Sequence, residues 1–445
     1  MSYPPLQLPL RFVVIALTAG VPFRSWSSPA AARSGLKAVV WWLPVLSTFH
    51  RKALGVTDEH GDAARPPEIV IVEPSAHRHY GHYAKTFAEI ADGFVDIGCR
   101  VSVVTSRGWI DDYPGRRFDL YRFGIVGTVA SGIAGGIWLT STRLNEGGGL
   151  RRKLGSIGLE VHKVLWSLTV VGAARAMVRK QGLDPAGILV LPPYTRPELV
   201  DRMAGRQRWL CSLGNLEDIP TGPSRRNSSA KIGITTANAE WTDIACPYPL
   251  FPIGLATARR STSDHDHLRR QFGVDDGVKV LLAAGIGHPA QRPDVIVDAV
   301  RGRADIQLVI AGKMSDRIDR SDLEGWSRPP IVRPGHLDFS ELDDLYCAAD
   351  AVIVSIRPGW PRDSAVQTDA VSHATPMLVS APSLPADRVL SFNAGEVFDA
   401  DSASSLGAAI DRLDLATARL GASAMREDLA ADTLARRYLE AFASL

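Results

Sequence analysis

Two runs of alternating strand-like and helix-like segments, separated by a proline-rich stretch, most constrain the fold of this chain. The first run begins with the β-branched segment 68–73 and continues through a helical segment at 83–97 to a strand at 101–105. A short apolar strand, a helix and a second strand in this order form a βαβ unit, which predicts a parallel sheet. Residues 247–256 (PYPLFPIGLA) interrupt the pattern, and the alternation restarts after them.

Each run predicts one doubly wound unit. Further strands of the first run are expected at 117–123, 187–192, 207–212 and 231–235. The second run predicts strands at 278–284, 306–311, 331–333, 350–355 and 376–380, and helices at 264–272, 293–301, 340–348, 364–373 and 403–413. The fold class is therefore α/β, with two Rossmann-like domains that face a cleft, preceded by an N-terminal extension and linker. The ligand is expected between the carboxyl ends of the strands of the two sheets.

Charge and cysteine content exclude several classes of protein. The 445 residues include 50 Lys and Arg against 48 Asp and Glu, a net charge of +2. A nucleic-acid-binding protein usually shows a clear basic excess, so nucleic acid is not expected as a partner. The four cysteines form no C-x-x-C pair, which favours buried or idle thiols in a reducing compartment.

The first 66 residues contain two apolar segments. Residues 10–23 carry too little positive charge ahead of them for a typical signal peptide, since Arg11 alone is basic there. Residues 36–48 are too short to span a bilayer, but Trp41 and Trp42 with basic flanking residues suit a membrane interface. A disordered leader, or sequence upstream of the true start, explains the segment equally well.

Residues 123–182 are the least regular part of the first run. The stretch 123–142 is uncharged but contains five glycines, which favours a loop or short packed helices over a spanning helix. Residues 153–180 predict one long helix. Its apolar stripe consists of Leu154, Ile157, Val161, Val164, Leu168 and Val171. Basic residues exceed acidic ones by six over 143–182, which fits either an anionic membrane surface or a core helix with a solvated basic back.

Five segments of the second run follow one another in a distinctive order. They are PIGLA at 252–256, HLRRQFGVDDGVKVLLAAGIG at 267–287, LVIAGK at 308–313, IVRPGHLDFSELDDLYCAADAVIVS at 331–355 and TDAVSHATPMLVSA at 368–381. Together they resemble the C-terminal domain of the family 4 glycosyltransferases of GT-B fold, over about residues 250–415. The resemblance implies an acceptor-side domain at 67–250, a nucleotide-sugar domain at 251–420 and a helix at 421–445 that returns to the first domain.

The resemblance also implies a donor site around the glycine loop 285–294. Gly285 and Gly287 follow a strand and precede a helix, where backbone N–H groups can approach a phosphate closely. The family's loop arginine and lysine fall on Ile286 and Gln291. Arg292 and Lys313 are the nearest cations, and either can contact phosphate or simply lie on the surface.

Two carboxylates are candidates for the family's pair of glutamates. Asp369 falls on the second glutamate, which accepts hydrogen bonds from the ribose, or it is a solvated helix carboxylate. Pro361 occupies the first position, and Asp363 is the nearest acid. Asp363 is either a displaced catalytic partner ahead of the helix or the N-cap of that helix. The family glycine of this segment falls on Ala374, which we take as a mild change.

The loop 75–85 of the first run corresponds to the family's acceptor-side glycine loop. Gly81 fits that glycine, and His77, His79 and His82 lie in the same loop. Without a neighbouring carboxylate or cysteine these histidines are not expected to bind a metal. His79 and His82 are assigned to the acceptor side, and His82 is, with Asp363, a candidate catalytic residue. The family's later catalytic histidine has no equivalent, since Tyr194, Thr195 and Arg196 stand there instead.

The most consistent hypothesis is a retaining glycosyltransferase. It would move a sugar from a nucleotide-sugar, as substrate and without a cofactor, to a saccharide or lipid-linked acceptor. The cytoplasm is the expected location, with peripheral contact at the inner face of the membrane. The alternative is a GT-B protein that has lost catalysis and binds a sugar nucleotide or a partner enzyme, and a sugar-nucleotide epimerase is a third hypothesis.

Overall fold

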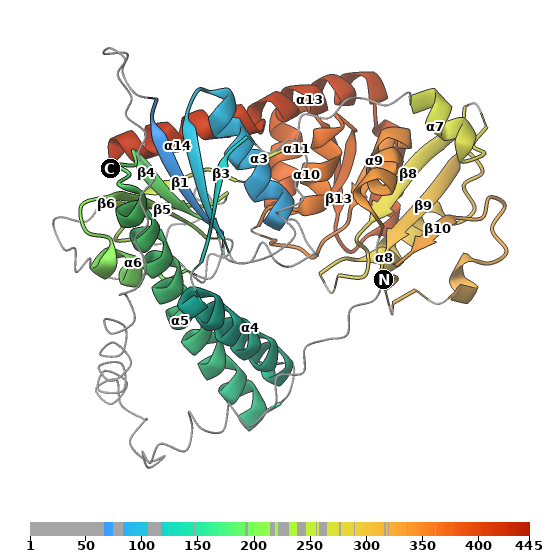
Figure 1. The fold of residues 1–445 in the computed structure, drawn as a ribbon. Helices are drawn as coiled ribbons and strands as arrows, with labels where there is room; N and C mark the ends of the chain where they lie inside the picture. Colours follow the sequence, from blue (N-terminus) through green and yellow to red (C-terminus); the bar gives the residue numbers. More distant parts are fainter. Residues whose placement is uncertain are drawn as a thin grey trace. The chain divides into compact units, whose positions relative to one another are not determined.

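The computed structural model describes residues 66–445 except for 74–82, 106–116, 124, 146–147, 192–194, 214–218, 221–230, 238–245, 255, 258–264, 276, 289, 316, 319, 336 and 361. The segment 36–48 therefore lies outside the described residues. The strands form two separate parallel sheets of seven and six strands, with helices against both faces of each sheet (Figure 1). The predicted α/β class with two doubly wound sheets is confirmed.

The first sheet contains all six strands predicted for the first run. Its strands are β1 (Glu68–Glu73), β2 (Arg100–Thr105), β3 (Asp119–Arg122), β4 (Gly187–Val190), β5 (Arg208–Ser212), β6 (Lys231–Thr235) and β7 (Leu250–Phe251), in the order β3-β2-β1-β4-β5-β6-β7. From Ile69 onward β1 is buried throughout, as expected for a central strand covered on both faces. The edge strand β7 was not predicted, because two residues in a proline-rich stretch show no strand pattern.

The second sheet contains one strand more than predicted. Its strands are β8 (Lys279–Ala284), β9 (Ile306–Gly312), β10 (Ile331–Pro334), β11 (Ala351–Val354), β12 (Met377–Ala381) and β13 (Gly395–Asp399), in the order β10-β9-β8-β11-β12-β13. The unpredicted strand β13 has Phe398 as its one buried residue, so it lacks the apolar run that marks its neighbours.

Helices close the apolar faces of both sheets. On the first sheet, α3 (Tyr83–Asp96) and α14 (Ala431–Ser444) cover one face and α5 (Leu150–Gln181) and α6 (Pro197–Met203) cover the other. On the second sheet, α8 (Pro293–Val300) and α12 (Ala403–Arg412) cover one face. The other face carries α9 (Phe339–Ala348), α10 (Ala365–Ser372), α11 (Leu384–Phe392) and α13 (Leu415–Asp428). The remaining elements are α7 (His265–Gln271) and the 3-10 turn η6 (Arg320–Leu323).

Two helices with proline in their first turn were not predicted from the sequence. The helix α6 begins at Pro197, and α11 has Pro385 in its first turn. Proline is favoured there, since the first N–H groups of a helix have no intrahelical partner. Ser383 caps α11 by accepting a hydrogen bond from the N–H of Ala386 at 3.2 Å.

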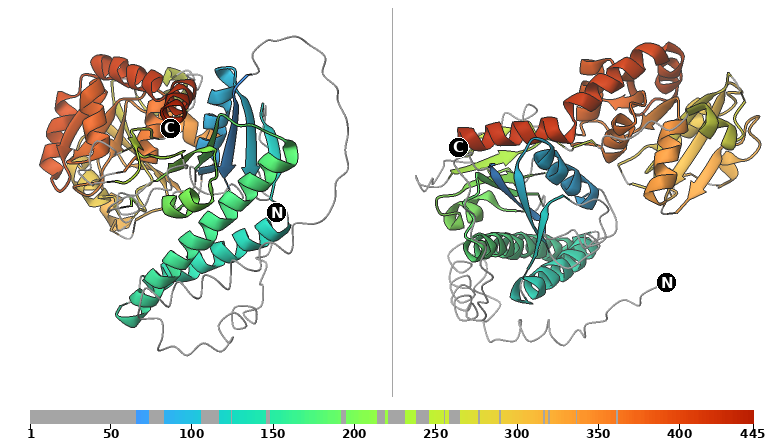
Figure 2. Two further views of the ribbon diagram at one scale, coloured as in Figure 1. Left: turned by 90° about the vertical axis from the view of Figure 1, so that its left-hand side faces the viewer. Right: turned by 45° about the horizontal axis from the view of Figure 1, so that its top comes forward.

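The prediction of a loop or short helices at 123–142 is wrong. These residues belong to one helix, α4 (Ile125–Asn145), which runs beside α5 and extends with it away from the first sheet (Figures 1 and 2). A Cβ at Gly155 or Gly158 of α5 would lie 2.7 or 2.0 Å from atoms of α4, so these glycines permit a close helix pair. This packing offsets the low helix propensity of the glycines in α4.

The apolar stripe of α5 is only partly a core stripe, so the interpretation of α5 as a core helix holds for its inner half alone. Val171 is buried against the sheet, but Leu154, Ile157 and Val161 are exposed. The buried residues of the outer half are instead Gly155 and His162, which face α4. By length and composition α5 is the one helix among the described residues that could cross a membrane, a test that core helices of soluble proteins also pass.

The expected single helix over 421–445 consists of two helices. The break falls at Leu429 and Ala430, between α13 and α14. Thr257 lies against this break, because its N–H donates to the carbonyl of Leu429 at 2.9 Å. The last helix, α14, packs on α3, where a Cβ at Gly93 would lie 2.3 Å from the carbonyl oxygen of Ala431 (Figure 2). The chain thus leaves the first sheet beside the point where it returns.

Candidate functional site

The strand order of the second sheet creates a place for a ligand. The chain leaves β8 toward β9 and β10 on one side, and later places β11 on the other side of β8. The loops after β8 and β11 diverge there, and open α/β sheets bind ligands in the crevice at such a reversal. The first sheet has the same reversal between β1 and β4.

The loops after β8 and β9 lie in backbone contact through glycines. Gly285 has a φ of +65° and Gly312 has a φ of +102°, values that favour glycine. A Cβ at Gly287 would lie 2.5 Å from the carbonyl oxygen of Lys313. From the sequence, Gly287 was expected to let the backbone approach a phosphate, but in the structure the neighbouring loop already requires a glycine.

The two predicted phosphate-binding cations differ in their surroundings. The side chain of Arg292 donates to Asp294 at 2.9 Å and also pairs with Asp401, and its hydrogen bond lowers the pKa of Asp294. Lys313 is exposed and forms no ion pair with another described residue. The cation available to a ligand beside the glycine loop is therefore Lys313, whereas Arg292 is held by two carboxylates.

A group of aromatic and cationic side chains joins the loops after β8 and β11. The N–H of Arg357 donates to the carbonyl of Ala290 at 2.8 Å. The ring centroids of His288 and Trp360 are 6.0 Å apart, and the guanidinium carbons of Arg357 and Arg362 lie 5.4 and 5.3 Å from the Trp360 centroid. Burial, followed by the charges of Arg362 and Arg357, lowers the pKa of His288, which favours the neutral ring.

Only part of this group was expected from the sequence. The stretch RPGWPRD at 357–363 predicts Arg357 and Trp360 near the donor cleft. His288 and Arg362 were missed, since more than 70 residues separate them and only the pairing of β8 with β11 brings their loops together. An arginine on either side of a tryptophan, as in RPGWPR, is the one local signal that pointed to the pair.

Asp363 lies in the loop ahead of α10, and the N-cap interpretation is wrong. The N-cap is Ser364, whose hydroxyl accepts a hydrogen bond from the N–H of Gln367 at 3.4 Å. Asp363 instead forms an ion pair with Arg388 of α11. A Cβ at Gly254 would lie 2.7 Å from a carboxylate oxygen of Asp363, so this pair sits against the segment that joins the sheets.

Asp369 is in the second turn of α10 and is 8% exposed. Burial, followed by the charge of Asp369, raises the pKa of the buried Tyr346. One turn earlier, Val366 faces the glycine loop, since a Cβ at Gly285 would lie 3.4 Å from its side chain. The first turn of α10 thus borders the loop, and Asp369 lies one turn deeper on the same side of the helix.

The change from glycine to Ala374 is not mild, contrary to the sequence analysis. Ala374 has a φ of +52° directly after the last turn of α10. Glycine is the usual residue there, because its missing Cβ removes the clash of a left-handed conformation. The backbone is fixed by two hydrogen bonds, from Ala374 N–H to Val371 at 2.9 Å and from Thr375 N–H to Ala370 at 3.0 Å.

Most of the site residues predicted for the first sheet are not among the described residues. His77, His79, Gly81, His82 and Tyr194 lie outside the described residues. After β4, the side chain of Arg196 pairs with Glu160 of α5 and its N–H donates to the hydroxyl of Ser167 at 2.8 Å. The helix α5 therefore holds the loop at the carboxyl end of β4.

Within the described ranges, no three His, Cys, Asp or Glu side chains come together as a metal site. Since the histidines of the loop 75–85 lie outside these ranges, the expectation of a metal-free site remains a prediction.

Comparisons with known proteins give a match in structure alone. No family model and no curated protein matches the chain. Sucrose-phosphate synthase from Thermosynechococcus elongatus aligns with a TM-score of 0.56 at 16% identity, over 85% of this chain and all of its own. A glycosyltransferase from Rickettsia africae gives 0.55 at 11% identity, over 85% and 98%. Anabaena HepE, in complex with UDP and glucose, gives 0.53 at 13% identity, over 85% and 99%.

At these identities the comparisons show the fold, which is the GT-B fold of two Rossmann-like domains. The resemblance read from the sequence is confirmed at this level.

Proposed function

We propose that this chain is a retaining glycosyltransferase that moves a sugar from a nucleotide-sugar donor to a saccharide or lipid-linked acceptor. The main supporting observation is the positive charge at the crevice between β8 and β11, where the strand order of the second sheet reverses. Lys313, Arg357 and Arg362 stand on the loops after β9 and β11, next to the glycine loop. One sugar-binding protein of this fold, HepE, holds UDP and glucose.

The chemistry of transfer explains why charge belongs there. When the bond between the anomeric carbon and the diphosphate oxygen breaks, the leaving nucleoside diphosphate gains negative charge. Cations and backbone N–H groups already in place stabilise that charge without reorganisation. The first turn of α10 adds N–H groups next to Gly285, since Val366 faces that loop.

The proposed roles of the carboxylates follow from their positions. Asp369 would accept hydrogen bonds from the ribose hydroxyls, and Asp363 would contact the donor sugar from the loop ahead of α10. The pairing of Asp363 with Arg388 favours a positioning role over proton transfer. His82 remains the candidate on the acceptor side.

The donor site is tested by calorimetry with a panel of nucleotide sugars that starts with UDP-glucose, followed by an assay for released nucleotide. Lys313→Gln and Asp369→Ala are each expected to weaken binding by about tenfold, the effect of one lost charged hydrogen bond. Asp363→Ala should weaken it less. Arg270→Gln removes an exposed charge from α7 and is the matched control for Lys313→Gln.

The outcomes separate the hypotheses. Binding with nucleotide release supports the transferase. Binding without release, across acceptors, supports the alternative of a sugar-nucleotide-binding protein without catalysis, for which the capture of Arg292 by two carboxylates is the structural argument. No binding of any nucleotide sugar would contradict both.

We further propose that the protein acts at the inner face of a membrane, with the hairpin of α4 and α5 on the lipid surface. Nine large apolar side chains are exposed among the described residues, and seven of them lie on this hairpin. They are Val129, Ile133, Leu139, Leu150, Leu154, Ile157 and Val161, with exposed fractions of 40% to 72%. Arg143, Arg151, Arg152 and Lys153 are exposed next to them. An apolar face with adjacent basic residues suits an anionic leaflet.

Co-sedimentation with anionic liposomes tests the hairpin. Leu154→Ser combined with Ile157→Ser should reduce binding at all salt concentrations, because it removes an apolar contribution. Arg151→Gln combined with Arg152→Gln should reduce it mainly at low salt, at about 1 kcal/mol per residue. Leu420→Ser, an exposed leucine of α13, is the matched control. Equal sedimentation of all variants would contradict the proposal that the hairpin binds the lipid surface.

The segment 36–48 gives a second arm to this experiment. A chain that begins at Glu68 keeps the hairpin but lacks the two tryptophans. It is expected to bind more weakly than the full chain. If the full chain stays in the supernatant at low salt, the membrane proposal fails and a soluble acceptor becomes the better hypothesis.

A further inference from the structure

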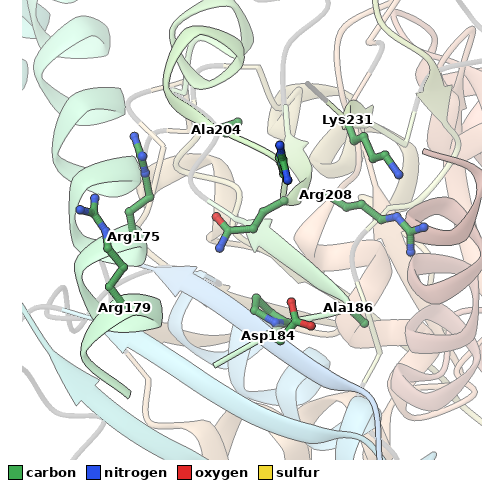
Figure 3. A pocket seen from close by; sticks show the side chains of 11 residues that line it. Arg175, Arg179, Asp184, Ala186, Ala204, Arg208 and Lys231 are labelled. Atoms are coloured by element: carbon green, nitrogen blue, oxygen red, sulfur yellow. The ribbon is translucent and has the colours of Figure 1, made fainter. Parts of the chain in front are cut away.

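A second cavity lies in the first sheet, away from the crevice described above. It has a volume of about 600 Å³, within the usual range of small-molecule pockets. Five cations and one carboxylate line it: Arg175, Arg179, Arg206, Arg208, Lys231 and Asp184. In Figure 3, Arg175 and Arg179 extend from α5 on one side and Lys231 lies on the other.

This cavity, the basic pocket, opens at the amino ends of the strands. Arg208 is the first residue of β5 and Lys231 is the first residue of β6. Ligands of open α/β sheets bind at the carboxyl ends, which lie at the opposite edge. The basic pocket is therefore separate from the proposed donor and acceptor sites.

Two of its cations are paired in register on neighbouring strands. Arg208 of β5 is the direct partner of Lys231 of β6 in the parallel ladder. Neighbouring strands are about 4.8 Å apart, so the backbones of two like-charged residues are held side by side at the edge of the sheet. Like charges in this arrangement repel, and an anion bound between them would relieve the repulsion.

The described residues neutralise little of this charge. Within the part of the chain that the structure describes, none of the five cations forms an ion pair, and Asp184 is the one carboxylate that lines the pocket. Arg175 and Arg179 have a structural reason to be there, since the last turns of a helix favour cations. Arg206, Arg208 and Lys231 have no such reason. The pocket thus has an excess of four positive charges.

We propose that the basic pocket binds an anion that carries two or more phosphoryl groups. One phosphate of charge near −2 would leave half of the excess charge uncompensated, whereas a diphosphate or triphosphate matches it. Arginine side chains are suited to such a ligand, because the planar guanidinium donates two parallel hydrogen bonds to phosphate oxygens. The proposal does not depend on the transfer reaction, so it stands or fails separately from the proposed function.

Calorimetry of the full chain with inorganic pyrophosphate tests the site. Arg208→Gln and Lys231→Gln are each expected to raise the Kd for pyrophosphate by about tenfold or more. Arg202→Gln removes an exposed charge from the neighbouring helix α6 and should leave the Kd within about twofold. Lys313→Gln reports on pyrophosphate that binds at the donor loop, and it should not change the affinity of the pocket.

Three results would overturn the proposal. These are an absence of pyrophosphate binding, equal effects of Arg202→Gln and the two pocket variants, and loss of binding in Lys313→Gln alone. Because the pocket residues are at the surface, the variants should fold, and an unchanged melting temperature without ligand verifies this. Stabilisation by pyrophosphate in a thermal melt is an independent readout that the pocket variants should lose.

The phosphoryl groups can come from a soluble compound or from a lipid headgroup. Vesicles of phosphatidylglycerol with a polyphosphorylated lipid separate the two sources. If Arg208→Gln and Lys231→Gln lower vesicle binding and pyrophosphate competes with the vesicles, the ligand is a headgroup. If vesicle binding is unchanged while pyrophosphate binding is lost, the ligand is soluble. Both results keep the basic pocket as a phosphoryl site.

Discussion

Replacement of Ala374 by glycine should stabilise the protein. Ala374 holds a φ of +52°, and the left-handed conformation costs a non-glycine residue about 1–2 kcal/mol. Glycine avoids this cost but loses about 0.4–1 kcal/mol through the greater freedom of the unfolded chain. The difference predicts a gain of about 0.5–1 kcal/mol. No nearby atom needs to move, because the substitution removes a methyl group.

Urea denaturation measures this gain directly. Ala374→Gly should raise the midpoint without a change in slope, since the surface exposed on unfolding is the same. Asn393→Gly is the matched control: its φ is +53°, but asparagine tolerates this conformation, so little or no gain is expected. Gly302→Ala is the reverse control, because φ is +83° and open space surrounds the added Cβ. It should destabilise by about 1 kcal/mol.

Two results would refute the reasoning about Ala374. A lower midpoint for Ala374→Gly would mean that the methyl group contributes more to packing than the conformation costs. An equal gain for Asn393→Gly would mean that the effect does not depend on the residue's tolerance of positive φ.

Three further predictions concern the second domain. Asp350→Asn should destabilise it by about 3 kcal/mol, because it leaves the partly buried Arg269 without its carboxylate partner, and urea midpoints measure this. Gly287→Ala should lower donor affinity and turnover by roughly 10–100-fold, since the new Cβ must push the Lys313 carbonyl away, while α-helix content by circular dichroism stays unchanged. Burial lowers the pKa of His373, but hydrogen bonds with the carboxylate of Asp343 and the thiol of Cys347 outweigh burial and raise this pKa overall. Its contribution to stability is therefore complete below about pH 6.5 and is lost as the pH rises through the folded-state pKa, so thermal melts of His373→Gln should lack the parent's decrease above neutral pH.

The sequence alone determined the repeated βαβ pattern. Short, largely apolar runs such as 68–73 and 278–284, alternating with helical segments, are typical of parallel strands covered on both faces, so the two sheets followed from this alternation. The proline-rich stretch 247–256 stands between the two runs in the sequence. Segments with weak or conflicting local signals were missed, as in α6 and α11, where a favourable first-turn proline looks like a break.

The site was only partly accessible from the sequence. The glycine loop and Lys313 could be found because they follow predicted strands. Other features of the site depend on partners far away in the chain. Arg292 is held by Asp401, and Asp363 pairs with Arg388 instead of capping a helix. Gly287 must be glycine because the carbonyl of Lys313 lies against it.

Only the tertiary structure shows which side chains are exposed and which charged residues lie together. Helical periodicity places Leu154 and Ile157 on one face of a helix, but it does not say whether a sheet covers that face or α5 extends beyond it. In the same way, Arg208 and Lys231 begin strands that look ordinary in the sequence. Only the parallel register sets their charges side by side at the edge of the sheet, because register is a property of two strands and not of either one.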